Sequence, residues 1–173
     1  GDLMATGRDH DRRTKPSRRT REDNKLIATQ QRLKKMTKAD VRERAGVART
    51  YLATAEQKLR AAPAEIPSPE ATVAAGNAVN AAIAASDAIC GQVLGHCYNG
   101  PDHSAAASVL KGVQGADRLA NELTRLLSQK NNAHYGGYFT VKVAGEMVGR
   151  ARKLADPMPT HAIASRCPAP PPP

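Results

Sequence analysis

Apolar residues recur at helical spacing through most of this chain. The clearest stripe follows Thr37, and its members lie three or four residues apart: Val41, Ala45, Ala48, Leu52, Ala55 and Leu59. Such spacing places the apolar side chains on one face of a helix. Thr37 with Asp40 three residues later is a weak analogue of a capping box, which predicts the start of that helix. Pro63 predicts its end at about Ala62, because proline cannot continue a helix interior.

Four further helices follow from the same kind of pattern. Ser68 before Pro69 and Glu70 is typical of a helix start, and the Ala-rich segment after it predicts a long central helix to about Gly95. The remaining helices are predicted over about 103–112, over about 117–131, and from Thr140 to a point before Pro157. With short links and no internal repeat or strand hairpin, the pattern predicts an all-α bundle of four to five helices.

Composition agrees with closely packed helices and excludes several classes of protein. The 173 residues include four Tyr, one Phe and no Trp, so the apolar 40% consists mostly of small aliphatic residues. So few aromatic residues disfavour a β-sandwich or a platform that stacks several bases. No apolar run approaches the roughly 18 residues of a membrane span, and no signal peptide is expected. Three cysteines without C-x-x-C spacing favour the reducing cytoplasm.

Positive charge gathers toward the N-terminus. The net charge is +10 at pH 7, and residues 1–60 hold 17 Lys and Arg against 8 Asp and Glu, whereas residues 61–173 hold 9 against 8. We expect a basic, largely disordered extension over 1–35, with at most a short helix within 22–35. A helical bundle is expected over 36–156 and a Pro-rich disordered tail over 157–173. Such an extension can attract polyanions even if the fold itself does not read nucleic acid.

The strongest local chemical signal is the polar segment at the end of the fourth helix. It contains Arg125, Lys130, Asn131, Asn132, His134 and Tyr135. Histidine transfers protons near neutral pH, and a cation stabilises developing phosphate charge, so these residue types suffice for metal-free RNA cleavage. His134, Lys130 and Arg125 are the catalytic candidates, and Asn131, Asn132 and Tyr135 are candidates for ligand binding. The alternative interpretation is an ordinary helix C-terminus with a cation and a capping Asn.

Asp87 is a further candidate because it lies within the most apolar helix. A buried carboxylate is costly unless it is paired or hydrogen-bonded, so we expect a partner for it. Asp87 forms one side of an ion pair between helices, lies on an exposed face of its helix, or orients a His or Arg in a polar site between helices. Cys90, His96 and Cys97 lack the usual ligand spacing, and no phosphate-binding Gly loop occurs, so neither a metal nor a cofactor is expected.

Three segments together resemble the HEPN domain, namely NAVNAAIAASDAIC, GPDHSAAASVLK and LTRLLSQKNNAHYG. The resemblance covers roughly residues 37–156 and is strongest to the small stand-alone HEPN proteins common in actinobacteria. It implies a bundle of four to five helices that dimerises. Many members of the family are metal-independent ribonucleases, often toxins paired with a nucleotidyltransferase antitoxin, and others bind RNA or nucleotides without catalysis.

The catalytic motif of that family, R-x4-6-H, is degenerate in this chain. His134 matches its histidine, but Lys130 is one position too close and Arg125 is two positions too far. Lysine does not reproduce the bidentate grip of a guanidinium on phosphate. The modifiable Tyr of the toxin subgroup stands two residues after the His, whereas Tyr135 follows His134 directly.

The resemblance and the residues together give one expectation and two alternatives. We expect a cytoplasmic, dimeric HEPN-like domain whose polar site of His134, Lys130, Asn131 and Asp87 binds RNA or a nucleotide with weak or no catalysis. The first alternative is an endoribonuclease toxin. In that protein His134 is the acid and base, Lys130 or Arg125 stabilises the phosphate, and Asp87 is the orienting carboxylate. The second alternative is a dimeric protein-interaction module.

Overall fold

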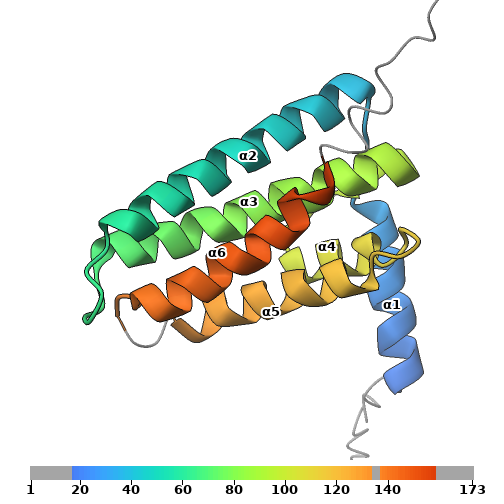
Figure 1. Ribbon diagram of the computed structural model, residues 1–173. Helices are drawn as coiled ribbons and strands as arrows, with labels where there is room; N and C mark the ends of the chain where they lie inside the picture. Colours follow the sequence, from blue (N-terminus) through green and yellow to red (C-terminus); the bar gives the residue numbers. More distant parts are fainter. Residues whose placement is uncertain (1–16, 134–136, 159–173) are drawn as a thin grey trace, which may run out of the picture. The chain divides into compact units, whose positions relative to one another are not determined.

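The computed structural model describes residues 17–133 and 137–158. These residues form six helices and one two-stranded sheet (Figure 1). In chain order the elements are α1 (Arg18–Gln31), β1 (Leu33–Lys35), α2 (Lys38–Ala61), α3 (Pro69–Leu94), β2 (His96–Tyr98), α4 (His103–Leu110), α5 (Asp117–Ala133) and α6 (Val141–Ala155). The chain divides into two compact units, residues 1–31 and residues 32–173, which are described separately below.

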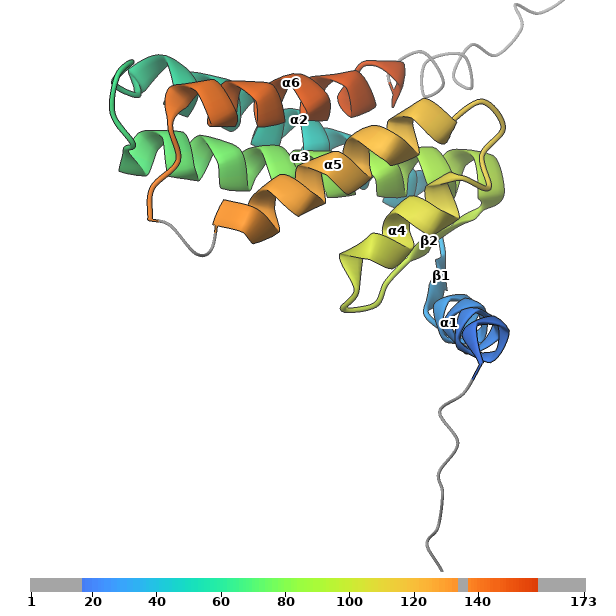
Figure 2. The same ribbon diagram turned by 90° about the horizontal axis from the view of Figure 1, so that it is seen from below.

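The second unit is an all-α bundle built around α3, and the predicted fold class is confirmed. α3 packs against α2, α6, α5 and α4 (Figures 1 and 2). Its many alanines are buried on most of its faces, and such small side chains let the neighbouring helices approach closely. The five largest fully buried side chains come from α4, α5 and α6, and they are Leu110, Leu123, Leu126, Met147 and Leu154.

The helix starts expected from the sequence are present. The Thr37 hydroxyl accepts a hydrogen bond from the Asp40 backbone N–H (3.1 Å), and the Asp40 carboxylate accepts one from the Thr37 N–H (2.8 Å), which completes a capping box. Ser68 caps α3 and Thr140 caps α6 through their hydroxyls. Gly95 ends α3 with a φ of 77°, a backbone conformation that glycine adopts without strain.

α3 is also long and apolar enough to cross a membrane, judged by length and composition alone. However, 67% of its most apolar window is buried inside the bundle. A helix that is apolar all round and covered by neighbouring helices is typical of the centre of a helical core.

The short helix expected within residues 22–35 is present, but it begins earlier, so that α1 covers Arg18–Gln31 of the segment expected to be largely disordered. α1 forms although none of its residues is buried, and an exposed ion pair joins Arg18 to Glu22 one turn later (3.3 Å). Its Arg, Glu, Lys and Gln residues favour a helix without any need for a buried face. Residues 1–16 and 159–173, on which the rest of the predicted disorder falls, lie outside the described residues.

The short sheet was not predicted at all. β1 pairs with β2 in antiparallel register, with Leu33 opposite Tyr98, Lys34 opposite Cys97 and Lys35 opposite His96. Each strand has three residues, and the two strands lie about sixty positions apart in the chain. Such short strands are too short to show the alternation of apolar and polar residues by which a strand is predicted. The sheet brings residues 32–35, which were assigned to the extension, into the same compact unit as the bundle.

Candidate functional site

The polar segment expected at the end of α5 lies at the limit of the described residues. α5 extends to Ala133, so Lys130 and Asn131 belong to its last turn. The Lys130 side chain is half-buried and that of Asn131 is exposed. His134 and Tyr135 lie outside the described residues, as does the side chain of Asn132.

Arg125 and Lys130 do not converge on one point. They are five residues apart on one helix, which separates them by about 140° around its axis. Lys130 shares a face with the buried Leu126, whereas Arg125 is exposed. The two candidate phosphate stabilisers therefore point away from each other.

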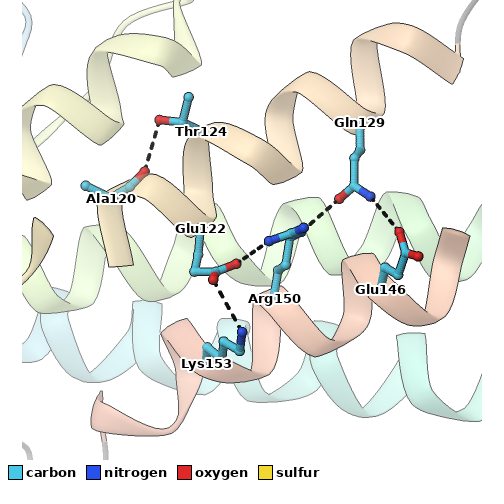
Figure 3. Close-up of polar contacts among 7 residues, drawn as sticks. All are labelled: Ala120, Glu122, Thr124, Gln129, Glu146, Arg150 and Lys153. Atoms are coloured by element: carbon cyan, nitrogen blue, oxygen red, sulfur yellow. Dashed lines mark hydrogen bonds and ion pairs between the residues drawn. The ribbon is translucent and has the colours of Figure 1, made fainter. Parts of the chain in front are cut away.

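A hydrogen-bonded network joins α5 to α6 at Glu122 and Gln129 (Figure 3). The Gln129 amide accepts from Arg150 Nε (3.2 Å) and donates to Glu146 (3.3 Å). Arg150 also donates to Glu122 (2.6 Å), and Lys153 donates to the other oxygen of that carboxylate (3.3 Å). The contact at Gln129 ties the end of α5 to α6 directly before Lys130 and Asn131.

The cations of this network set the charge state of Glu122. Partial burial raises the pKa of the Glu122 carboxyl. The hydrogen bonds and charges of Arg150 and Lys153 together lower that pKa by more than burial raises it, so the pKa lies below its ordinary value. Glu122 is thus an ionised structural carboxylate and not an acid that donates a proton near neutral pH.

Asp87 has the partner that a buried carboxylate needs, and the partner is Arg44 of α2. The Arg44 terminal nitrogen donates to Asp87 Oδ2 at 2.8 Å. The Asp87 side chain is only 12% exposed, and that of Arg44 is 34% exposed. Burial raises the pKa of Asp87, and the charge and hydrogen bond of Arg44 oppose that rise without cancelling it.

Asp87 is hydrogen-bonded to Arg44 of α2, and His134, the centre of the site expected to contain both Asp87 and the polar segment of α5, lies outside the described residues. α3 and α5 run in opposite directions, so the end of α5 lies at the same end of the bundle as the start of α3 (Figures 1 and 2). At that end Thr72 accepts a hydrogen bond from the Phe139 N–H (2.9 Å). Asp87 lies fifteen residues farther along α3 than Thr72, which is about 22 Å along the helix axis.

The cysteines near Asp87 are not reactive groups. Cys90 and Cys97 are both buried and free. Burial, with the Asp87 charge as the second cause, raises the pKa of Cys90 to about 12 and that of Cys97 to about 11. Both are thiols near neutral pH, and the thiolate is the nucleophilic and metal-binding form. Within residues 17–133 and 137–158, no three His, Cys, Asp or Glu residues are placed to hold a metal ion.

The positive charge of the chain lies mostly on folded elements. Residues 32–60, which form β1 and nearly all of α2, hold nine Lys and Arg against three Asp and Glu. Residues 1–31 hold eight against five. The net charge of these two segments is therefore +6 and +3. Of the excess positive charge that the sequence places in residues 1–60, the larger part therefore lies in the compact unit that contains the bundle and not in residues 1–31.

Four cations form a single face of α2, called here the α2 basic face: Lys38, Arg42, Arg49 and Arg60. All four are exposed, and among the described residues none has an ion-pair partner. Their spacing places them within about 40° of one another around the helix axis and spreads them over about 33 Å. The one acidic residue on this side of α2, Glu56, is neutralised by Arg152 of α6 at 2.7 Å.

Comparisons with models of protein families, with curated proteins and with solved structures found no match to this chain.

Proposed function

We propose that this protein is a helical domain that binds single-stranded RNA through the α2 basic face and does not cleave it. The observation that carries the proposal is the row of four exposed cations on one helix. A row about 33 Å long can meet several consecutive phosphates of an extended strand. The near-absence of aromatic residues makes base stacking a minor contribution, so the binding is electrostatic, salt-dependent and tolerant of sequence.

The separation of the candidate catalytic groups favours binding without cleavage. Arg125 and Lys130 point in different directions from α5. Asp87, in the second half of α3, accepts a hydrogen bond from Arg44 of α2. A general base and a phosphate stabiliser must both reach the reacting atoms at hydrogen-bond distance. The resemblance to HEPN domains fits this proposal, because non-catalytic members of that family bind RNA, and it favours RNA over DNA as the polyanion.

An assay of binding and cleavage on the same RNA tests the proposal. The full chain and a His134→Ala variant are incubated with a fluorescent single-stranded RNA and with an RNA hairpin, both in EDTA. We expect anisotropy to report binding by both proteins and gels to show intact RNA throughout.

Two outcomes would overturn the proposal. RNA cleavage by the parent that is absent from His134→Ala would identify a metal-independent endoribonuclease instead. No RNA binding at low salt, together with a defined dimer in solution, would favour the protein-interaction module.

A further inference from the structure

One acidic residue, Glu56, interrupts the α2 basic face. It lies seven residues after Arg49 and four residues before Arg60, which is about 10 Å and about 6 Å along the helix axis. Around the axis it lies within about 40° of all four cations of that face. An unpaired carboxylate at this position would repel a phosphate backbone that follows the row.

The cation that neutralises Glu56 comes from another helix. α6 runs antiparallel to α2 and packs beside it (Figures 1 and 2). Arg152 of α6 donates two hydrogen bonds to the same oxygen of Glu56, one from Nε at 3.1 Å and one from a terminal nitrogen at 2.7 Å. The Arg152 guanidinium is therefore held beside the stretch of α2 that runs from Arg49 to Arg60.

This ion pair lies where a bound strand would pass. The Arg152 side chain is 50% exposed and that of Glu56 is 31% exposed, so the pair is open to solvent and to a ligand. With Arg152 present the pair is neutral, and the row keeps the full charge of its four cations. Without Arg152, the Glu56 charge would subtract one unit in the middle of the row.

The other acidic residues of α2 and α6 do not take this place. Asp40 and Glu43 lie at least about 100° around the α2 axis from the row. Glu146 of α6 accepts a hydrogen bond from Gln129 of α5. Asp156 is exposed one turn beyond Arg152, and its charge is the same in every variant compared below. Glu56 is thus the acid whose state decides whether the row is continuous.

We propose that Arg152 of α6 is part of the RNA-binding surface, because by neutralising Glu56 it keeps the row of cations on α2 continuous. This inference rests on the function proposed above. RNA binding then depends on the contact between α6 and α2 and not on α2 alone. Arg152 acts on the RNA through Glu56, so its role requires the positive charge and not a direct contact with phosphate.

Anisotropy titrations of a fluorescent single-stranded RNA, with the full chain and its variants at several salt concentrations, test this role. Each phosphate contact contributes about 0.7 to the salt slope, so Arg152→Gln should lower the slope by about 0.7 and the affinity at about 0.1 M salt about fivefold. Arg152→Lys keeps the charge and should bind like the parent. The matched control is Lys153→Gln, which removes the same charge from the neighbouring residue, whose ammonium contacts Glu122 of α5.

Adding Glu56→Gln to Arg152→Gln separates charge neutralisation from a structural role. The double variant lacks the anion that Arg152 neutralises, so its affinity and salt slope should return to within about twofold of the parent. If the pair only held α6 against α2, the double variant would stay weak, because it lacks the contact as well. The pair is partly exposed, so the variants should fold, which circular dichroism checks.

A second pair of variants keeps the test valid if Arg152→Gln fails to fold. Glu56→Gln alone leaves Arg152 as a fifth cation on the row and should strengthen RNA binding about fivefold at about 0.1 M salt. Glu43→Gln removes the same charge from another side of α2 and should leave the affinity close to that of the parent.

Failure of this inference differs from failure of the proposed function. RNA binding by the parent that is unchanged in Arg152→Gln, or that stays weak in the double variant, would overturn the role of Arg152 and leave RNA binding by α2 standing. No RNA binding by the parent at low salt would overturn the proposed function and this inference together.

Discussion

Replacing Arg44 with Met is expected to lower the free energy of unfolding by about 3 kcal/mol at neutral pH, as breaking a buried ion pair does. Met keeps much of the length and volume of the side chain and removes the charge. Asp87, 12% exposed, then loses its hydrogen-bonded cation. We place the loss at the lower end of the range for buried pairs because Arg44 itself is a third exposed.

The loss should depend on pH in a definite direction. Burial raises the pKa of Asp87 and Arg44 opposes that rise, so the pKa rises further in Arg44→Met. The folded variant then keeps a proton at pH values where the unfolded chain has released it, and its stability increases as the pH falls. The difference in unfolding free energy between parent and variant should therefore narrow from neutral pH toward about pH 4, the ordinary pKa of aspartic acid.

Urea unfolding at several pH values, with Asp87→Asn and the double variant beside Arg44→Met, measures this effect. Asp87→Asn should cost less than Arg44→Met, because a third-exposed arginine can turn to water. The double variant should be more stable than Arg44→Met alone, since it leaves no buried charge. A loss in Arg44→Met that is below about 0.5 kcal/mol, the scale of an exposed pair, or that is constant with pH would show that Asp87 is not buried as described.

Changing all four cations of the α2 basic face to Gln is expected to remove most of the affinity for single-stranded RNA. Each phosphate contact contributes about 0.7 to the slope of log K against log salt, so the slope should fall by about 3. The electrostatic contribution vanishes at about 1 M salt. At about 0.1 M salt the affinity of the variant for RNA should therefore be about 10²- to 10³-fold lower than that of the parent. The fold should survive, because all four side chains are exposed and lack ion-pair partners among the described residues.

The matched control is a variant with Gln at Arg18, Arg19, Arg21 and Lys25 of α1. It removes the same formal charge from the other compact unit, where no residue of the helix is buried. Its salt slope should remain close to that of the parent. If the α1 variant loses the affinity and the α2 variant keeps it, the RNA is held by the N-terminal unit and the assignment to α2 fails.

The helices of the bundle could be predicted because their signals are local. Thr37, Ser68 and Thr140 cap helices within three residues of themselves, and the apolar stripe after Thr37 lies within one helix. The start of α1 was missed for the opposite reason: residues 18–21 have no apolar member, so only their helix propensity indicates the first turn, whereas a short helix was expected within 22–35.

The site was harder to predict because its contacts are distant in sequence. Asp87 was expected to have a partner, and its burial alone justified that expectation, but Arg44 lies 43 residues earlier in the chain. Nothing in the sequence around either residue indicates the pairing. The four cations of the α2 basic face, in contrast, are spaced by near-multiples of a helical turn, and that signal was available once the helix had been predicted.

Amide NMR mapping of the ¹⁵N-labelled full chain, titrated with a single-stranded RNA, locates the RNA-binding surface most directly. We predict that the largest shifts and broadening follow Lys38, Arg42, Arg49 and Arg60 along α2 and reverse on addition of salt. Shifts confined to the last turn of α5 around Lys130 and Asn131, with α2 unaffected, would contradict the assignment of RNA binding to the α2 basic face.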